Sequence, residues 1–401
     1  MIAVAIEALY LHIPFCRSRC AYCDFDTCAK GPHEIPVLAG SYVDQLTARL
    51  EMLGGRDVLR GVKTIYVGGG TPTVLGMSLP VLVRCVRHWC DPVEITCEAN
   101  PESFSESLAR GLKAAGVTRI SLGVQSLIDD ELRLVGRIHT AKMALAAIER
   151  AKRIGFSTSC DLICNLPGQT LKSWESTLDR LIEAGPDHVS VYPLQLEENT
   201  PLGRRVAAGE LAAPDEDFQG AAMSLARERL MAAGFEPYEV ASYAKPGHAC
   251  RHNIAYWTGK SYLGLGRSAA SMASAEEIAA LPRPFAAGAF GTAVADAAHD
   301  SSSRIRFKQL DDVGANVEVE AMTEREALAE DLMLACRMTA GIPADLLHRA
   351  ATVIPVESLR NACERAVSLG LATWTGSALA PTDLGWLNGN ELFELFWDLA
   401  D

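Results

Sequence analysis

Three cysteines near the start of the chain have the spacing of a metal site. Cys16, Cys20 and Cys23 form the pattern C-x3-C-x2-C directly after an apolar, strand-like run at residues 8–13. Thiolates bind zinc and iron–sulfur clusters, and a structural zinc ion needs four ligands. A [4Fe-4S] cluster on three thiolates keeps one iron open for a small molecule. The spacing favours such a cluster; zinc with Cys28 as the fourth ligand, or a chance arrangement, are the alternatives.

The segment that carries these cysteines, LYLHIPFCRSRCAYCDFD, resembles the cluster loop of the radical S-adenosylmethionine (SAM) superfamily. The resemblance rests on the cysteine spacing, the preceding strand and the aromatic Tyr22 before the last cysteine. It implies a [4Fe-4S] cluster on Cys16, Cys20 and Cys23, with SAM on the open iron.

Polar residues follow the later predicted strands, where a parallel barrel places its ligand-binding groups. They are a Gly triplet with Thr71 after the second strand, Glu98 at the third, Gln125 at the fourth, Asp161 at the fifth, and Arg137 in LVGRIHT. Arg137 could hold the methionine carboxylate of SAM in bidentate fashion, and glycines let a ligand approach the backbone. The two acidic side chains and the amide could hold the ammonium group or the ribose hydroxyls.

The motifs YLHIPFC, GGGTPT, EANPES, SLGVQS and DLI-x-x-LPGQT together resemble the coproporphyrinogen dehydrogenase-like branch of that superfamily. By this resemblance the SAM contacts are Tyr10, Gly69, Gly70, Thr71, Glu98, Gln125, Arg137 and Asp161.

Two features separate this chain from the dehydrogenase itself. Phe25 stands where the dehydrogenase has a further cysteine, and Cys16 lies almost at the start of the chain. Both features resemble the HemW-type heme chaperones, in which a radical SAM barrel is paired with heme binding. Other positions depart from the relatives: Arg267 and Ala270 lie in GLGRSAASM, where a Gly-Ala-His type of sequence is usual, and Asn165 replaces a usual Gly.

A second motif, in HACRHNIAYWTGK, resembles the HNxxYW sequence associated with heme binding in that group. Its residues are His252, Asn253, Tyr256 and Trp257. A neutral imidazole is a common axial heme ligand, and aromatic rings can pack on a porphyrin face. The resemblance implies His252 as the heme ligand. In the alternative interpretation, His252 and Asn253 satisfy backbone groups and the two aromatic residues fill core.

These patterns lead to two main hypotheses. The first is a heme chaperone that binds heme and a [4Fe-4S] cluster with SAM and transfers the heme to an unidentified acceptor protein. The second is a radical SAM oxidoreductase that cleaves SAM to a 5′-deoxyadenosyl radical and abstracts hydrogen from coproporphyrinogen III or another tetrapyrrole. Phe25 and the HNxxYW motif favour the first, and no catalytic residue is assigned. A zinc-stabilised barrel without SAM chemistry is a third alternative, and a homodimer is compatible with the sequence.

Strand-like and helix-like runs alternate over the first 195 residues, which predicts βαβ units and a parallel sheet. The predicted strands are Ala8–Ile13, Thr64–Val67, Val93–Glu98, Arg119–Val124, Ser157–Ile163 and His188–Pro193. The predicted helices include Tyr42–Leu53, Leu79–Trp89, Glu106–Ala115, Lys142–Ile154 and Leu171–Ala184. Six units favour a partial (β/α)6 TIM-like barrel, and a doubly wound sheet is the alternative.

Three regions are expected along the chain. Residues 1–270 form the barrel with the cluster and the SAM site, and residues 271–322, rich in Ala, Ser and Gly at their start, form a partly helical connector. Residues 323–401 form a smaller, mainly helical domain whose short hairpin in LATWTGSALAPT makes it winged-helix-like. This last region carries five Arg, no Lys and twelve Asp or Glu, which argues against DNA binding.

Composition limits the partners and the compartment. The formal net charge of −13 argues against nucleic-acid binding, which needs clustered basic residues. The longest apolar run, at residues 285–295, is too short for a membrane helix. The start of the chain has no basic segment and contains Glu7, so it does not resemble a signal peptide. Twelve cysteines in 401 residues are too few for a disulfide scaffold, and we expect a cytoplasmic protein.

Overall fold

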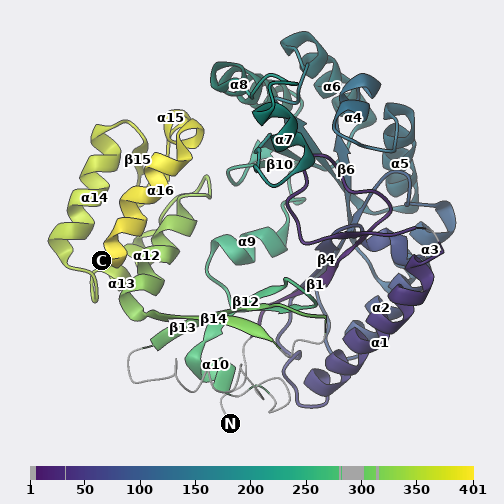
Figure 1. The fold of residues 1–401 in the computed structure, drawn as a ribbon. Coiled ribbons are helices and arrows are strands. Elements are labelled where there is room, and N and C mark those ends of the chain that lie inside the picture. The colour runs from purple at the N-terminus through teal and green to yellow at the C-terminus, as the bar shows by residue number, and fades with distance from the viewer. Residues whose placement is uncertain (1–5, 32, 280, 282–301, 313–315) are drawn as a thin grey trace.

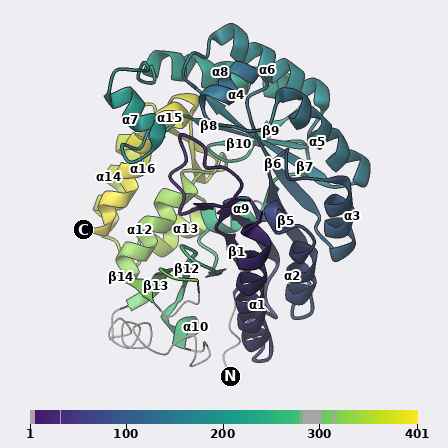
Figure 2. The same ribbon diagram turned by 45° about the vertical axis from the view of Figure 1, so that its right-hand side comes forward.

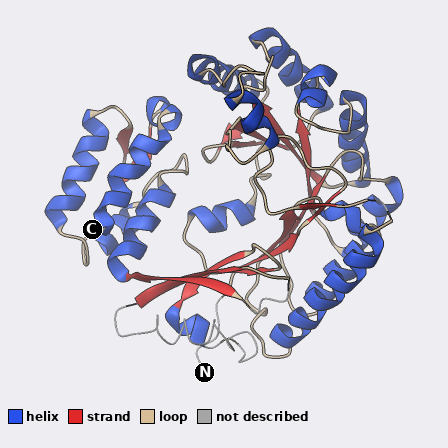
Figure 3. Cartoon of the chain, in the orientation of Figure 1, coloured by secondary structure: helices blue, strands red, loops and turns tan. Residues whose placement is uncertain are grey.

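A computed structural model describes residues 6–31, 33–279, 281, 302–312 and 316–401. One large curved sheet carries helices along its outer face, and a second group of helices lies across from it (Figures 1 and 3). The sheet has 12 strands in the order β14-β13-β12-β11-β1-β4-β5-β6-β7-β8-β10-β9. Its strands are β1 (Ala8–Ile13), β4 (Thr64–Gly69), β5 (Glu94–Ala99), β6 (Arg119–Gln125), β7 (Ser157–Cys164), β8 (His188–Pro193), β9 (Glu236–Pro237), β10 (Ser242–Ala244), β11 (Tyr262–Leu265), β12 (Ala270–Ser274), β13 (Ser302–Gln309) and β14 (Val317–Thr323).

The central strands β11, β1, β4, β5, β6, β7 and β8 are all parallel to one another. Helices connect them, and the longer ones cover the convex side (Figure 1). These elements are α1 (Ile35–Gly54), η1 (Pro72–Leu75), α2 (Ser78–Arg87), α3 (Glu106–Ala115), α4 (Asp129–Leu134), α5 (Ala141–Ile154), α6 (Leu171–Ala184), α7 (Pro201–Ala207) and α8 (Glu216–Ala232). The partial (β/α)6 barrel is confirmed, and the doubly wound alternative is wrong because the covering helices lie on one face.

Three of these helices begin and end at residues that satisfy the free backbone groups of a helix. The side chains of Ser105, Thr140 and Thr170 accept a hydrogen bond from the first turn of α3, α5 and α6. Glycines in the left-handed conformation, including Gly116 and Gly155, follow the last turns. Local sequence therefore sets the ends of these helices.

The two faces of the parallel strands differ in polarity. Residues such as Leu11, Val67 and Ile95 point outward into the apolar core that the sheet shares with the helices. The alternate residues, such as Thr96 and Ser159, point inward and are polar. The interior of the half-open barrel is therefore a polar lumen, in contrast to the branched apolar layers of a closed TIM barrel.

The region expected as a connector, residues 271–322, differs from the expectation where it is described. Its described residues include strands β13 and β14, which extend the sheet beyond β11 and β12 in antiparallel pairs, and the short helix α10 (Ala275–Ala279). Ile305 and Phe307 are buried and alternate with arginines, which is a strand pattern. Residues 282–301, with the apolar run at 285–295, lie outside the described residues.

The C-terminal region has a separate hydrophobic core. Its elements are α12 (Glu324–Ala335), α13 (Ala344–Ala350), α14 (Val356–Ser368), β15 (Ala372–Thr375), β16 (Ala378–Pro381), α15 (Asp383–Leu387), α16 (Gly389–Trp397) and η2 (Asp398–Ala400). Helices followed by an antiparallel hairpin agree with the mainly helical, winged-helix-like region that the sequence predicts. Within the described part of the chain, no helix is long and apolar enough to cross a membrane.

Candidate functional site

A cavity of about 470 Å³ lies at the carboxyl ends of the parallel strands, beneath the segment that follows β1. Ten of the twelve predicted site residues line it: Cys16, Cys20, Cys23, Gly69, Gly70, Thr71, Glu98, Gln125, Arg137 and Asp161. Tyr10 and His252 are not among the lining residues. The cavity is of a size that holds a small-molecule cofactor.

The cysteine loop, residues 16–30, closes one side of this cavity. Its stem is a pair of short parallel strands, β2 (Phe15–Cys16) and β3 (Cys28–Ala29). Farther along the loop, the Ala21 N–H donates to the Val135 carbonyl at 2.9 Å, and the Ala21 carbonyl accepts from the Leu202 N–H at 2.8 Å. The fold thus fixes the loop at its base and at its outer turn.

The donor set fits a cluster better than a single ion. Three thiols face one end of the cavity, whereas Cys28 lies on the stem strand β3 and does not line it. Among the described residues, no three His, Cys, Asp or Glu side chains are placed to share one metal ion. In a [4Fe-4S] cluster each thiolate binds a different iron, so its ligands need not converge on one point. Burial raises the pKa of the Cys16 and Cys23 thiols in the cofactor-free protein.

Gly69 and Gly70, at the end of β4, leave space for neighbouring protein atoms as well as for a ligand. A Cβ on Gly69, whose φ is +111°, would overlap the His12 ring at 2.8 Å. A Cβ on Gly70 would lie 2.9 Å from the Cys16 sulfur. The Gly69 N–H also donates to Glu98 Oε2 at 3.1 Å. A side chain at Gly69 would therefore displace the His12 ring, and one at Gly70 would displace the start of the cysteine loop.

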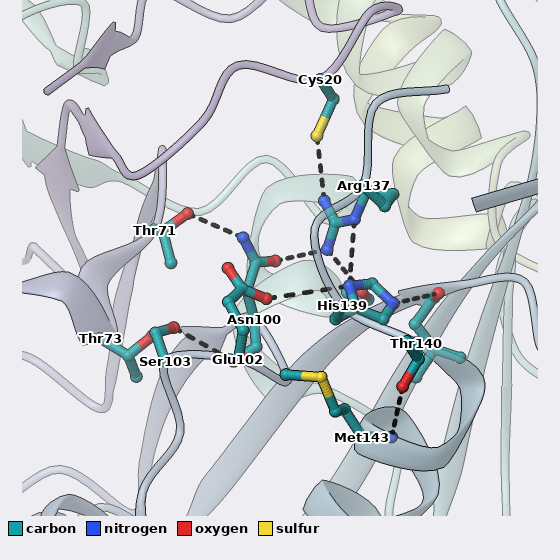
Figure 4. Close-up of polar contacts among 12 residues, drawn as sticks. Cys20, Thr71, Thr73, Asn100, Glu102, Ser103, Arg137, His139, Thr140 and Met143 are labelled. Carbon is teal, nitrogen blue, oxygen red and sulfur yellow. Dashed lines mark hydrogen bonds and ion pairs between the residues drawn. The ribbon is translucent and has the colours of Figure 1, made fainter. Parts of the chain in front are cut away.

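Arg137 joins the cysteine loop to the floor of the cavity (Figure 4). Its Nη1 lies 3.2 Å from the Cys20 sulfur, and its Nη2 donates to Asn100 Oδ1 and to the Gly123 carbonyl, both at 2.7 Å. Asn100 in turn donates to Thr71 Oγ1 at 2.9 Å. The bidentate contact with a carboxylate that the sequence suggests would require Arg137 to release some of these partners.

Two buried carboxyl groups face the cavity. Glu98 accepts hydrogen bonds from the Tyr66 hydroxyl at 2.8 Å and from Gly69, and burial raises its pKa to about 7. Asp161 accepts from Ser121 Oγ at 3.1 Å, and burial raises its pKa to about 6. Near neutral pH both carboxyl groups can therefore change their protonation when a ligand brings positive charge or hydroxyl donors.

Gln125 occupies a strained position at the end of β6. Its φ is +64°, in the left-handed region that non-glycine residues rarely adopt, and the pairing of β6 with β7 shifts register between Gly123 and Gln125. Such strain concentrates at functional sites. The distortion turns the end of β6 toward the cavity that Gln125 lines.

Sequence reasoning missed several residues of the site. Tyr66, Asn100, Ser121 and Tyr192 also line the cavity. The first and third lie two residues or more before the strand ends, on the inward face. The signal that could have found them is the alternation of polar and apolar residues along strands whose other face is buried.

The HNxxYW motif lies away from the cavity, on helix α9 (Arg251–Trp257), which packs against the starts of β4 and β5. His252 is 1% exposed, and its Nδ1 is 3.0 Å from the Thr64 hydroxyl. Its Nε2 has no hydrogen-bond partner among the described residues, and burial lowers its pKa to about 3, so the ring is neutral. Tyr66 separates it from the cavity, with its ring centroid 5.2 Å from that of His252.

Comparisons with known proteins agree with this geometry. Residues 10–191 match the family described as the radical SAM superfamily. In a solved structure, coproporphyrinogen III oxidase (HemN) from Escherichia coli, a radical SAM enzyme, has the same fold, with a TM-score of 0.76 and 22% identity over 98% of this chain and 92% of that chain. The fold and the cysteine-lined cavity define a radical SAM protein.

Relatives with higher sequence identity narrow the assignment. The heme chaperone HemW of Mycobacterium tuberculosis is 42% identical over 65% of this chain and 68% of its own length. HemW of Bacillus subtilis is 30% identical over 98% of this chain and 99% of its own length, and HemW of E. coli is 38% identical over 66% and 70%. The chain belongs to the HemW family of the radical SAM superfamily.

Proposed function

We propose that this chain is a heme chaperone that binds a [4Fe-4S] cluster through Cys16, Cys20 and Cys23, binds SAM beside it, and transfers heme to an acceptor protein. One observation carries the cofactor part of the proposal: a single cavity collects the three thiols and the polar strand ends. Membership in the HemW family supports the heme part, since the relatives are named heme chaperones. A bound cluster would supply redox-active iron with one open coordination position.

The chain's own residues would orient SAM. Glu98 and Asp161 offer carboxylate oxygens for the ammonium group or the ribose hydroxyls, and Gly69 and Gly70 leave the backbone open. Arg137 offers positive charge next to Cys20 for the methionine carboxylate. Tyr10 does not line the cavity, and its hydroxyl is 2.9 Å from His12 Nδ1. It would therefore act on bound SAM only indirectly.

The heme part of the proposal centres on His252. Its Nε2 is buried without a hydrogen-bond partner among the described residues, and the neutral imidazole suits iron ligation. Because the ring is 1% exposed, heme ligation requires α9 to move or its surroundings to open. The acceptor is a protein that takes up heme, and the cytoplasm is the expected compartment.

Titration of anaerobically reconstituted protein with heme, followed by the Soret absorption band, tests this function. We expect saturable binding near one heme per chain and weaker binding in His252→Ala. His248→Ala serves as the matched control, because His248 lies outside the motif and contacts Ser157. Wild-type binding no better than that of a non-specific control protein without a heme site would contradict the chaperone assignment. Release of 5′-deoxyadenosine with conversion of coproporphyrinogen III would favour the oxidoreductase instead.

Cys20→Ala should abolish cluster binding, because the loss of one of three thiolates leaves an iron without its ligand. Iron and acid-labile sulfide are measured after anaerobic reconstitution. Cys28→Ala is the matched control within the same loop and should keep wild-type iron and sulfide. Full iron and sulfide in Cys20→Ala would contradict the cluster assignment, and zinc without sulfide in the wild type would restore the zinc alternative.

A further inference from the structure

An ion pair ties the cysteine loop to the segment that follows β11. The Arg267 guanidinium donates two parallel hydrogen bonds to the Asp26 carboxylate, Nε to Oδ2 at 2.7 Å and Nη2 to Oδ1 at 2.6 Å. The Ser268 hydroxyl donates to Asp26 Oδ2 at 2.5 Å. We call these three residues the latch. Paired contacts of this kind fix orientation as well as distance.

The side of the latch that carries Arg267 is held firmly by Gln309 of β13. Gln309 is 1% exposed, and its side chain accepts from the Gly266 N–H at 3.1 Å and donates to the Gly264 carbonyl at 2.5 Å. Its backbone carbonyl accepts from the Ser268 N–H at 2.7 Å. Ser268 is thereby kept at a φ of +60°. The strand that the sequence did not predict is therefore what presents the latch.

The side of the latch that carries Asp26 has weaker support of its own. Asp26 lies on the returning arm of the cysteine loop, residues 24–27, directly after Cys23. Two other side-chain contacts of this arm are longer: Asn199 Nδ2 to Asp24 Oδ1 at 3.5 Å, and His12 Nε2 to the Asp26 carbonyl at 3.4 Å. The latch is therefore the strongest tie of this arm to the body of the protein.

We propose that Arg267 is a positioning residue for the iron–sulfur site: through Asp26 it holds the returning arm closed and keeps Cys23 facing the cavity. The cluster that this geometry serves rests on the proposed function, whereas the closure of the loop does not. Arg267 and Asp26 side chains are 46% and 35% exposed, so the pair contributes little to global stability. Its loss should instead favour local opening of the loop.

Site-resolved alkylation of the reduced, cofactor-free protein with iodoacetamide tests the closure directly. Mass spectrometry measures the rate at Cys23 and, as an internal reference, at Cys336 in the C-terminal core. We expect Arg267→Ala to raise the Cys23 rate about tenfold, as a locally opened segment would, and to leave the Cys336 rate unchanged. Arg267→Lys should give a smaller increase, because an ammonium cannot form the paired contact.

Two further variants separate the latch from a general loss of charge. Arg153→Ala removes an exposed paired contact with Glu106 far from the loop and should leave the Cys23 rate at the wild-type value. The charge swap Asp26→Arg with Arg267→Asp should restore slow alkylation relative to Arg267→Ala. Wild-type rates at Cys23 in Arg267→Ala, or failure of the swap to slow the reaction, would overturn the proposal.

In reconstituted protein, Arg267→Ala should bind iron and sulfide and then lose the cluster absorbance several-fold faster than wild type after exposure to air. An equal rate of loss would contradict the role at the cluster. If the wild-type chain bound no iron, the proposed function would fail, and the alkylation rates would still decide whether the latch exists.

Discussion

At the scale of single residues, the cavity holds two carboxyl groups whose charge is costly without a ligand. Glu98 on β5 and Asp161 on β7 lie on the inner face of the sheet. Burial raises the pKa of both carboxyl groups, and the charge of Asp161 raises the pKa of Glu98 further. Tyr66 donates a hydrogen bond to Glu98 and Ser121 donates one to Asp161. These bonds reduce the free-energy cost of ionising the two carboxyl groups but do not remove it. A cationic or hydroxyl-rich ligand would complete their hydrogen bonding.

This raised pKa predicts that the cofactor-free protein loses stability as the pH rises. Glu98 titrates at about 7 in the fold but at 4.5 when unperturbed, so its contribution is fully present below 4.5 and is lost as the pH rises through 7. The shift corresponds to at most about 3 kcal/mol. Glu98→Gln should show a flatter dependence of the free energy of unfolding on pH, measured by urea unfolding between these values. The exposed Glu357→Gln should keep the pH dependence of the wild-type protein. The same unchanged pH dependence in Glu98→Gln would contradict this reasoning.

Asp161→Ala should weaken SAM binding without removing iron, since Asp161 lines the cavity but lies apart from the cysteine loop. Loss of a charged hydrogen-bond partner predicts a dissociation constant raised about 10- to 100-fold. Equilibrium dialysis with reconstituted protein gives the constant, and iron analysis gives the loading. Asp345→Ala on α13 is the control, and normal SAM binding by Asp161→Ala would refute its assigned role.

Much of the cavity lining was predictable because its residues stand at strand ends within recognisable motifs. Tyr66 and Ser121 were not predicted, because they lie inside strands and only the curvature of the sheet turns their face into a lumen. Arg137 was predicted as a ligand for a carboxylate, yet its contacts with Cys20 and Asn100 depend on the path of two loops. Side-chain pairing across loops has no counterpart in local sequence.

At the scale of elements, helix α9 is held by the barrel through its backbone. Glu94, at the start of β5, accepts from the N–H groups of Arg251 and His252, both at 3.1 Å. Glu94 thereby accepts from free N–H groups in the first turn of α9, where the N-cap residue, Cys250, provides no side-chain hydrogen bond. Tyr66 on β4 contacts the His252 ring of α9 and donates to Glu98 on β5. The motif helix and the cavity thus share one aromatic wall.

Glu94→Ala should lower the free energy of unfolding by about 1–3 kcal/mol, because it leaves two backbone N–H groups, one of them buried, without an acceptor. Glu94→Gln keeps one carbonyl oxygen and should lower it less. Urea unfolding followed by circular dichroism measures both. The exposed Glu364→Ala on α14 should change stability by less than either, and equal effects of all three variants would contradict this role for Glu94.

The strands and helices of the barrel were largely predictable, and β1, β8, α3 and α6 have the predicted bounds. Each has apolar residues at the regular spacing of a strand or a helix, with turn or cap residues at its ends. The strands β13 and β14 were missed because the Ala-, Ser- and Gly-rich stretch before them suggested a connector. β2 and β3 are two residues each, too short for any periodicity to appear.

At the scale of the whole molecule, the C-terminal region packs against α9 and the edge of the sheet (Figure 2). The Arg337 guanidinium lies 5.0 Å from the Trp257 ring centroid and 4.7 Å from that of Phe393. Trp386 Nε1 donates to the Val240 carbonyl at 2.7 Å. The last residue of the HNxxYW motif therefore touches both halves of the molecule.

A largely buried ion network joins β13 to α12. Arg304 donates to Glu330 at 2.8 Å and to Asp331 at 2.7 Å, and the three side chains are 12%, 4% and 13% exposed. Arg304→Ala leaves Asp331 without this partner and Glu330 with Arg306 alone, and it should lower the free energy of unfolding by about 3 kcal/mol. Limited proteolysis should cut faster near residues 310–323. Exposed Arg360→Ala should change stability by less than about 1 kcal/mol, and an equally small effect of Arg304→Ala would contradict the network's role.

The latch joins an early part of the chain to a late one, so it can form only after most of the chain has been synthesised. Asp26 and Arg267 are 241 residues apart, and β1 finds its second neighbour, β11, only when Leu263 and Leu265 have been synthesised. Because chains emerge from the ribosome N-terminus first, the cysteine loop exists long before Arg267 can pair with Asp26. Throughout that interval one edge of β1 is unpaired. Pairing of β1 with β11 and formation of the latch are therefore both late steps in the synthesis and folding of the chain.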